Sequence, residues 1–226
     1  MKYERVKAAS FLSRPNRFIA EVELLGKREI AHVKNTGRCK ELLIPETTVF
    51  LEEFDNPKRS TKYDLIAVKK GEMLINVDSM APNKAVFEFL KSGRLFENVT
   101  KIRPETTYVD SRFDFYLETE NDKIFIEVKG VTLENDGVVM FPDAPTERGV
   151  KHIKELIAAR NDGYKAYVIF VVQMAECKYF TPNRATHPEF ADALIAARKG
   201  GVEILAYNCK VTPVTMTIDE PVEVNL

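Results

Sequence analysis

The sequence has no apolar run long enough to cross a membrane. Its longest apolar stretch, residues 166–172, is far short of the roughly 20 residues that a membrane-spanning helix needs. Lys2, Glu4 and Arg5 bring charge to the first residues, so the apolar core of a secretory signal peptide is also missing. We therefore expect a cytoplasmic protein without a membrane partner.

Cysteine and histidine are scarce, with three of each in 226 residues. No two cysteines form a Cys-x-x-Cys pair and no two histidines lie at metal-binding spacing, so a zinc site has no obvious ligand set. An odd number of widely spaced cysteines is typical of reduced thiols in a cytoplasm. The 10 glycines and 11 prolines are close to ordinary usage, which excludes low-complexity and collagen-like chains.

The whole chain has almost equal numbers of positive and negative residues, with 33 Lys+Arg and 34 Asp+Glu. Residues 1–84, however, hold 16 Lys+Arg and 12 Asp+Glu, whereas the remainder holds 17 and 22. One interpretation is a polyanion-binding first part joined to a part with a carboxylate site. The other is a chance distribution, and composition leaves both open.

The first 78 residues have the pattern of short strands and turns. Residues 17–25 alternate apolar and polar, and a turn at Gly26-Lys27 leads into residues 28–34 as a hairpin. Further strands are predicted at residues 49–53, 63–69 and 73–77. Short, closely spaced strands without a helical period predict a small closed barrel of the oligonucleotide-binding (OB) kind.

The pattern changes at residues 79–83, which predicts a barrel domain over residues 1–82 and a second domain over 83–226. Asn83 is expected to cap a helix that runs to Lys91. Two extended stretches (107–118 and 123–131), a helix capped near Thr146, a buried strand (165–172), a helix from Pro188 and a last strand (202–207) follow. This order predicts an α+β protein whose second domain is a sheet with helices on its faces.

Ionisable residues on the two extended stretches are the candidates for chemistry. Alternation places Phe113 and Phe115 on one face and Asp114 on the other, and it places Glu127 and Lys129 together. Adjacent carboxylates repel unless a cation lies between them, and hard oxygen ligands suit Mg²⁺ or Mn²⁺. A neighbouring lysine can orient water or stabilise charge on a phosphate, so the pattern predicts phosphodiester hydrolysis.

The spacing of thirteen residues between Asp114 and Glu127 is weak on its own in a chain with 30% charged residues. The other acidic-x-Lys sequence, Glu176-Cys177-Lys178, has only Asp162 upstream, in an Asn-Asp-Gly turn. The first set alone lies on two neighbouring predicted strands. Solvated strand charges or a local ion pair remain the alternative to a metal site.

Several segments resemble the sugar fermentation stimulation protein A family, and they cover nearly the whole chain: His32–Gly37, Asn56–Arg59, Ser111–Phe115, Glu127–Leu133, Phe141–His152 and Gly201–Tyr207. The resemblance implies an OB-like barrel followed by an α/β/α domain with a mixed sheet, similar to PD-(D/E)xK nucleases. It also implies DNA binding largely without sequence specificity, and a regulatory role in sugar, notably maltose, metabolism.

The resemblance further implies which residues act. Asp114, Glu127 and Lys129 correspond to the catalytic nuclease motif. The implied metal ligands are Asp114, Glu127, the carbonyl of Val128, and Glu88 on the preceding helix, with Mg²⁺ or Mn²⁺ as the ion. For Glu88 an exposed helical glutamate is the alternative.

Basic and polar residues in both domains are the predicted nucleic-acid contacts: Arg14, Arg17, Lys34, Asn35, Arg38, Lys58, Arg59, Arg148, Lys151 and His152. The last three begin a helix, whose N-terminus favours phosphate. Phe11, Phe18 and Phe54 are candidates for base stacking or for the core. Asn35-Thr36-Gly37 predicts a tight turn with Gly37 at positive φ, and Gln173 ends a strand near the same place.

Two functions therefore remain from the sequence. The first is a DNA-binding protein, with RNA as a second possible partner, that hydrolyses phosphodiesters with a divalent metal. The alternative is a non-catalytic DNA-binding regulator of sugar (maltose) metabolism genes. The complete Asp114, Glu127 and Lys129 set favours catalysis, because a pure binder gains nothing from carboxylates facing a polyanion.

Overall fold

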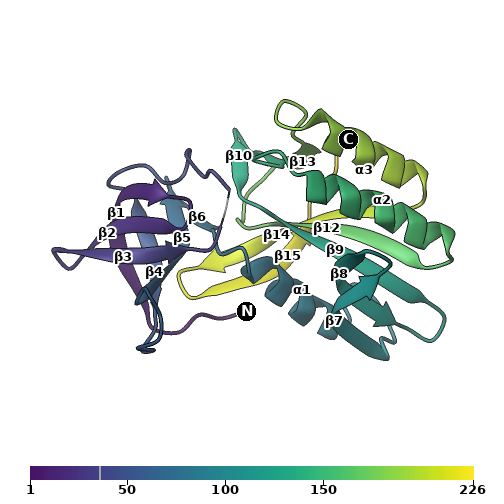
Figure 1. Cartoon of the computed structure of the whole chain (residues 1–226), viewed down its shortest axis with the longest axis horizontal. Helices are drawn as coiled ribbons and strands as arrows, with labels where there is room; N and C mark the ends of the chain where they lie inside the picture. Colours follow the sequence, from purple (N-terminus) through teal and green to yellow (C-terminus); the bar gives the residue numbers. More distant parts are fainter. Residues whose placement is uncertain (36) are drawn as a thin grey trace.

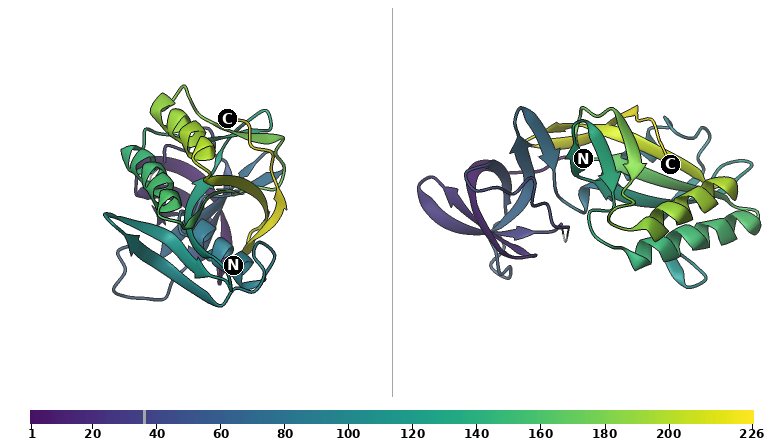
Figure 2. Two further views of the ribbon diagram at one scale, coloured as in Figure 1. Left: turned by 90° about the vertical axis from the view of Figure 1, so that its right-hand side faces the viewer. Right: turned by 90° about the horizontal axis from the view of Figure 1, so that it is seen from above.

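The computed structural model describes residues 1–35 and 37–226. A small β-barrel and a larger α/β domain lie side by side (Figure 1). The chain is elongated along the line that joins the two domains, as Figure 2 shows from above. Among the described residues, no helix is long and apolar enough to span a membrane.

The first domain has six strands: β1 (Val6–Asn16), β2 (Ile19–Leu24), β3 (Lys27–Val33), β4 (Thr48–Glu53), β5 (Tyr63–Lys70) and β6 (Met73–Asn76). The sheet order is β3-β2-β1-β4-β5-β6, and a parallel pairing of β3 with β5 closes the first five strands into a barrel. Inward residues such as Val22, Leu51 and Leu65 are fully buried. The predicted OB-type barrel is confirmed.

The sequence prediction missed β1, the strand that pairs with both β2 and β4. Its register with β2 shifts twice, between Phe11 and Ser13 and again before Asn16. These irregularities interrupt the apolar alternation by which a strand is found. The predicted hairpin turn is also displaced by one residue, because Leu24 pairs with Lys27 and leaves Leu25 and Gly26 as the turn.

The second domain is centred on a mixed sheet with the order β15-β14-β12-β9-β8-β7. Its strands are β7 (Lys101–Tyr108), β8 (Ser111–Glu118), β9 (Lys123–Val131), β12 (Lys165–Val172), β14 (Glu203–Thr212) and β15 (Thr215–Pro221). A small second sheet contains β10 (Leu133–Asn135), β11 (Val138–Phe141) and β13 (Tyr179–Pro182). β9, β12 and β14 are parallel, and the outer strands are antiparallel.

Helices cover both faces of the mixed sheet (Figure 2). α2 (Glu147–Asn161) and α3 (Pro188–Lys199) pack on one face, in a core with Phe170. α1 (Ala81–Lys91) packs on the other, in a separate core with Ile169. Consecutive residues of the buried strand β12 thus enter opposite cores, and the predicted α/β/α arrangement is confirmed.

Several local predictions for this domain need correction. Asn83 does not cap α1, because the helix already begins at Ala81 with Pro82 in its first turn. The stretch predicted over residues 107–118 is not one strand: it holds the end of β7, a turn at Val109, where φ is positive, and β8. The α2 cap is as predicted, since the Thr146 hydroxyl accepts a hydrogen bond from the Gly149 N–H at 3.1 Å.

The two domains share more than the connection after β6. Met1 and Tyr3 are buried in the α1-side core of the second domain, and Lys2 forms a β-bridge with Thr215. The chain therefore begins on the second domain before it enters the barrel. The division of the chain after residue 82 remains a prediction.

Candidate active site

Asp114 lies on β8 where the pairing of that strand with β9 ends. The last paired residues are Phe115 and Ile126. Beyond them, Asp114 Oδ2 accepts a hydrogen bond from the Val128 N–H at 2.7 Å. Its other oxygen, Oδ1, accepts one from Asn83 Nδ2 at 2.7 Å. The carboxylate is thus held by the β9 backbone and by the first turn of α1.

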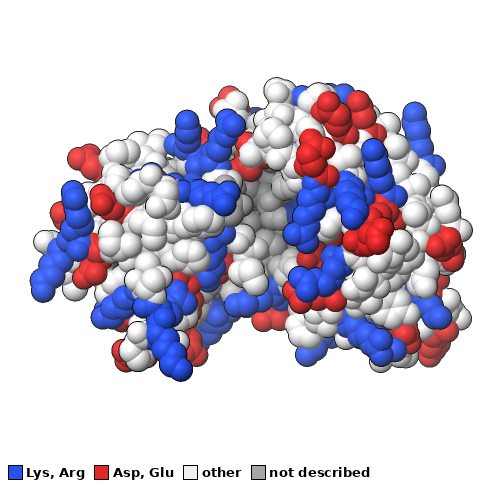
Figure 3. Space-filling model, viewed as in Figure 1, with Lys and Arg blue, Asp and Glu red and all other residues white. Residues whose placement is uncertain are grey.

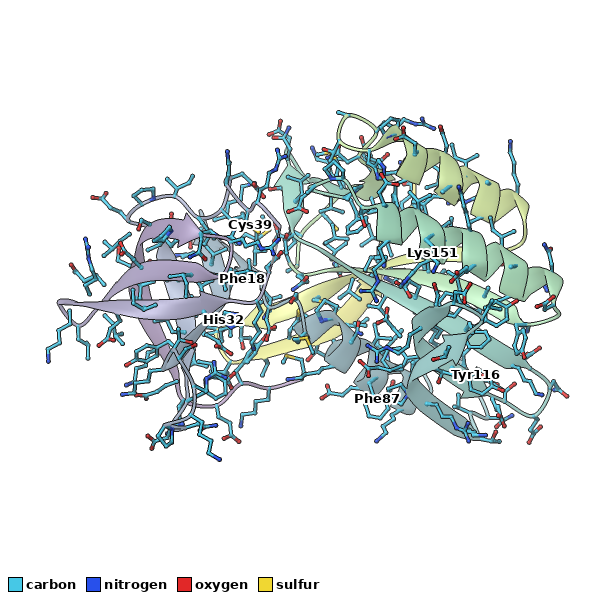
Figure 4. All side chains as sticks on the ribbon, in the orientation of Figure 1. Phe18, His32, Cys39, Phe87, Tyr116 and Lys151 are labelled. Carbon is cyan, nitrogen blue, oxygen red and sulfur yellow. The ribbon has the colours of Figure 1, made fainter. Side chains whose placement is uncertain are left out.

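The strand does not keep the predicted alternation through this point. Phe113 packs on the α2 side, with its ring centroid 5.2 Å from that of Phe125. Phe115 packs on the α1 side, stacked on Phe87 at 6.1 Å. The expectation that the two phenylalanines share a face was wrong, because they enter opposite cores on either side of the point where the pairing of β8 with β9 ends. Figure 4 shows Phe87 beside the β7–β8 hairpin.

Glu127 and Lys129 do share a face of β9, as predicted. The Lys129 ammonium contacts Glu127 Oε1, and His152 Nδ1 of α2 lies 2.5 Å from the same oxygen. The Glu127 side chain is only 3% exposed. Its other oxygen, Oε2, is buried and has no hydrogen-bond partner among residues 1–35 and 37–226. Buried carboxylate oxygens without a donor are uncommon in proteins, and Asp64 Oδ2 and Glu155 Oε2 are the others in the described chain.

His152 was predicted to contact nucleic acid, but the structure buries it beneath α2. Arg148 Nε donates a hydrogen bond to His152 Nε2 at 3.3 Å. Since Nε2 accepts, the ring proton is on Nδ1 and is donated to Glu127 Oε1. His152 therefore orients the Glu127 carboxylate, and Arg148 in turn fixes the tautomer of the imidazole.

The two carboxylates differ electrostatically. Burial, and the neighbouring Glu127 charge, raise the pKa of Asp114 above its ordinary range. Burial acts in the same direction on Glu127, but His152 and Lys129 outweigh it and lower the pKa of Glu127. Glu127 is thus firmly anionic, whereas the negative charge on Asp114 is disfavoured by its surroundings. A cation between the two would relieve that repulsion.

The donor set fits a hard divalent cation such as Mg²⁺ or Mn²⁺. Glu127 Oε2 is free, and each Asp114 oxygen keeps a lone pair after its single hydrogen bond. No group of three His, Cys, Asp or Glu side chains gathers at any point of the described chain. A cation here would need backbone or water oxygens in addition, which is the usual coordination of Mg²⁺. The carbonyl of Val128 remains a predicted ligand.

Glu88, the fourth predicted ligand, does not join this group. Its carboxylate lies 2.6 Å from the amino group of Met1, and its side chain is 57% exposed. Five positions along a helix place it about 140° around the axis from Asn83, which does reach Asp114. Asn83 is the residue that the sequence reasoning misassigned as a cap. Nothing in the sequence links it to Asp114, 31 residues away.

Three of the predicted nucleic-acid contacts in the barrel have structural partners. Arg14 donates hydrogen bonds to four backbone carbonyls of the segment 17–38, at 2.7–2.9 Å. Lys34 lies 3.1 Å from Asp64 and 3.0 Å from Asp78, both fully buried. Arg59 contacts the same Asp64. These three side chains form internal contacts with carbonyl groups or buried carboxylates. The barrel therefore has fewer free positive charges for a nucleic-acid partner than the sequence suggested.

Five of the remaining predicted contacts keep exposed side chains: Arg17, Arg38, Lys58, Arg148 and Lys151. Asn35 is half-buried. Figure 3 shows lysine and arginine side chains on both sides of a hollow between the two domains. Of the aromatic candidates, Phe11 is in the core, whereas Phe18 is 42% exposed with Arg17 stacked 4.5 Å from its ring. Phe54 is half-buried, and Arg59 lies 4.0 Å from the centre of its ring.

The predicted tight turn of the barrel lies at residues 35–38, of which Thr36 is outside the described residues. Asn35 Oδ1 accepts a hydrogen bond from the Gly37 N–H at 2.8 Å, as in a tight turn. The positive φ of Gly37 stays a prediction, because that angle depends on Thr36. A Cβ atom at Gly37 would collide with the Asp143 carboxylate, which would have to move. The Arg38 N–H donates to the same carboxylate at 3.0 Å.

Gln173, at the end of β12, connects the domains. Its buried Nε2 donates to Asn76 Oδ1 and to the carbonyls of Asn76 and Asp78 at 3.0–3.2 Å. Its side-chain oxygen leaves no room for a Cβ at Gly130, the residue after Lys129. The barrel is thereby fixed directly beside the end of β9.

Comparison with known proteins identifies two family domains in the chain. Residues 12–77 match a family described as the SfsA N-terminal OB domain, and residues 80–215 match the sugar fermentation stimulation protein RE domain. This chain belongs to the SfsA family. Homologues from Ruminiclostridium cellulolyticum and Clostridium beijerinckii are 58% and 57% identical over the whole of both chains. The predicted family is confirmed.

A solved structure supports the SfsA fold over the full length. It is that of Pyrococcus furiosus SfsA in complex with Ca²⁺, and it has 28% sequence identity to this chain and a TM-score of 0.91. The similarity covers 100% of this chain and 98% of the other. The arrangement of barrel and second domain is therefore shared across distant SfsA proteins.

Proposed function

We propose that this SfsA protein is a nuclease that hydrolyses phosphodiester bonds in DNA with the help of Mg²⁺ or Mn²⁺, and that it binds DNA largely without regard to sequence. The observation that carries the proposal is the buried, unpartnered Oε2 of Glu127, whose negative charge also raises the pKa of the nearby Asp114. Two carboxylates this close repel each other, and a cation between them would relieve the repulsion.

Each residue of the site then has a distinct role. Asp114 and Glu127 would hold the cation, and Asn83 and His152 keep their carboxylates in position. A divalent ion at this place polarises the phosphoryl oxygen and makes bound water a nucleophile near neutral pH. The Lys129 ammonium, with 15% of its side chain exposed, is placed to stabilise negative charge that develops on the phosphate.

The Pyrococcus furiosus relative supports a divalent cation in the family, because its structure contains Ca²⁺. Ca²⁺ and Mg²⁺ are both hard ions that prefer oxygen ligands. Exposed cations such as Arg17, Lys58 and Lys151 support the nucleic-acid partner. Contacts of this kind read the phosphate backbone and not the bases.

The test is incubation of single- and double-stranded DNA, and of RNA, with the purified protein in Mg²⁺, Mn²⁺ or EDTA. Cleavage should require metal and disappear in Asp114→Asn and in Lys129→Ala. Asp114→Asn should bind DNA as well as the wild type or better, because a negative charge facing the phosphates is removed. Asp192→Asn, an exposed position on α3, is the matched control and should cleave normally.

The regulator interpretation gives a different result. If the wild type cleaves none of these nucleic acids with either metal, and binds DNA as tightly as Asp114→Asn does, the nuclease proposal fails. The protein would then be a DNA-binding regulator of sugar (maltose) metabolism genes. Cleavage that persists unchanged in Asp114→Asn would also contradict the proposal.

A further inference from the structure

A cavity of about 270 Å³ lies between the barrel and the second domain. One side is the barrel loop that contains Asn35 and Gly37, and the other is the segment from Met140 to Thr146 that leads into α2. Gly130, the residue after Lys129, also lines the cavity. The cavity therefore adjoins the end of the catalytic strand without being part of the Asp114 and Glu127 site.

The two sides of the cavity come from segments more than a hundred residues apart in the chain. They are the same segments, 32–37 and 141–152, that carry much of the resemblance to the SfsA family. Within the second segment, the nuclease proposal uses only Arg148, Lys151 and His152. The portion before α2 is left without a role, although it forms one wall of a cavity.

Described residues on both sides of the cavity are tied to the rest of the protein. Arg14 donates hydrogen bonds to the carbonyls of Asn35, Gly37 and Arg38. On the opposite side, the ring of Phe141 lies 5.1 Å from that of Phe190 in the core beneath α3. A preformed cavity of this kind loses little entropy when a ligand enters.

Among the described residues, the polar side chains that line the cavity are the Asp143 carboxylate, the Asn35 amide and the hydroxyls of Thr132 and Thr146. Asp143 accepts a hydrogen bond from the Arg38 N–H, and a carboxylate has capacity for further donors. Asn35 uses its Oδ1 for the Gly37 N–H, which leaves its amide NH₂ group to donate. Leu133, Met140 and Phe141 contribute apolar surface. This combination suits a flat heteroaromatic ring with amino and carbonyl edges, and the Asp143 charge disfavours a phosphate.

We infer that this cavity binds one unpaired nucleobase of the substrate strand, with preference for a base that carries an amino group, such as cytosine or adenine. The amino group would donate to Asp143, and Asn35 Nδ2 would donate to a ring or carbonyl acceptor. Thymine has carbonyl oxygens on both sides of its only N–H, and these would face the Asp143 carboxylate. The inference rests on the proposed function only in that the base belongs to a nucleic-acid strand.

Unpaired bases are required because bases in a duplex are stacked and hydrogen-bonded to each other. Entry of a base beside Gly130 would place its neighbouring phosphate toward Lys129. The cavity thus predicts that single-stranded or locally opened nucleic acid binds better than intact duplex. It also explains why the barrel is fixed so firmly against the end of β9 by Gln173.

The test measures the affinity of the protein in EDTA for oligonucleotides of equal length made of deoxycytidine, thymidine or abasic residues. The wild type should bind the cytosine oligomer roughly tenfold tighter than the abasic one. It should bind the thymine oligomer less tightly than the cytosine oligomer. Asp143→Asn should remove the difference between cytosine and thymine, because an amide can both donate and accept.

Two further variants test the cavity itself. Ala144→Leu, which fills the cavity, should bring the cytosine oligomer to the abasic level. Ala175→Leu, on an exposed loop, is the matched control and should keep the base preference. Equal binding of all three oligomers by the wild type would overturn the inference, as would full base preference in a folded Ala144→Leu protein.

Free deoxycytidine gives a test that needs no variant. It should raise the melting temperature of the wild type more than inorganic phosphate at the same concentration does, and the opposite order would contradict a base-binding cavity. Both measurements are made without metal, so they are independent of cleavage. Base preference without any cleavage would leave this inference standing while the nuclease proposal fails, and cleavage without base preference would do the reverse.

Discussion

Two buried groups of acidic side chains, one at the barrel and one in the second domain, have very different surroundings. Asp64 and Asp78 are fully buried, and the Lys34 ammonium lies within 3.1 Å of both. Asp114 and Glu127 are also largely buried, but Lys129 and His152 both contact Glu127, and no cationic side chain of residues 1–35 and 37–226 forms an ion pair with Asp114.

The difference separates a structural cluster from a functional one. At the barrel, burial opposes protonation of Lys34, yet the two aspartates still raise its pKa, so the cluster holds its charge balance firmly. Tyr3 and Asn76 extend the cluster toward the second domain. In the second domain, the pKa of Asp114 is raised first by burial and then by repulsion from Glu127, which the protein alone does not relieve. Unrelieved repulsion of this kind is typical of functional sites.

The largest effect is expected at the structural cluster. Lys34→Met leaves two buried aspartates without their shared cation, and removing one partner of a buried ion pair costs about 3–5 kcal/mol. Urea unfolding should show this loss in the free energy of unfolding. Lys58→Met, at an exposed position of the same domain, is the control and should change stability little. Weaker DNA binding with unchanged stability would instead assign Lys34 to the nucleic-acid surface.

An intermediate effect is expected at His152, which positions Glu127. His152→Ala should weaken Mn²⁺ binding by about 10–100-fold, as the loss of a partner behind a metal ligand usually does. His152→Gln, whose amide can still donate to Glu127, should recover part of the affinity. Titration calorimetry with Mn²⁺ measures both values. Unchanged Mn²⁺ affinity in a folded His152→Ala protein would show that the imidazole does not position the carboxylate.

A smaller effect with a defined sign is expected for stability against pH. Because the pKa of Asp114 is raised above its ordinary 3.8, the folded protein binds this proton more tightly than the unfolded chain does. The ionised side chain therefore costs stability above its folded pKa, and the cost disappears below 3.8. Relative to Asp114→Asn, the wild type should gain stability as the pH falls from 7 toward 3.8. The comparison uses the change with pH, because the asparagine NH₂ would also face one of the two N–H donors that now bind the Asp114 carboxylate. A stability difference that does not change with pH would contradict the raised pKa.

The smallest effect is expected at single exposed cations. Lys58→Ala should weaken binding to all DNA sequences alike and lower the slope of log affinity against log salt by about 0.7–0.9 if Lys58 contacts one phosphate. Arg59→Ala should also reduce stability, because Arg59 contacts the buried Asp64. Fluorescence anisotropy over a salt series measures the slope. A change for one DNA sequence only would contradict backbone binding.

Local periodicity and turn chemistry predicted most of the fold. The buried strand over Lys165–Val172 and the helix capped by Thr146 are both found at their predicted places. β1 was missed because its register shifts conceal the alternation. The small sheet of β10, β11 and β13 was missed because its strands are three or four residues long.

The site was predictable in its residue types and not in its contacts. Asp114, Glu127 and Lys129 follow from strand alternation and from the family resemblance. The roles of Asn83 and His152 depend on how α1 and α2 cross the sheet, which no local pattern encodes. The same holds for Lys34 and Arg14, whose positive charge suggested a phosphate partner while their contacts are internal.

Titration of the protein with Mn²⁺ by calorimetry tests most directly whether Asp114 and Glu127 form a cation site. We expect one Mn²⁺ site in the wild type, its loss in Asp114→Asn, and its retention in the control Asp192→Asn. The cluster of Asp64 and Asp78, already neutralised by Lys34 and Arg59, should bind no ion. Failure of the wild type to bind Mn²⁺, or equal binding by Asp114→Asn, would contradict a cation site at Asp114 and Glu127.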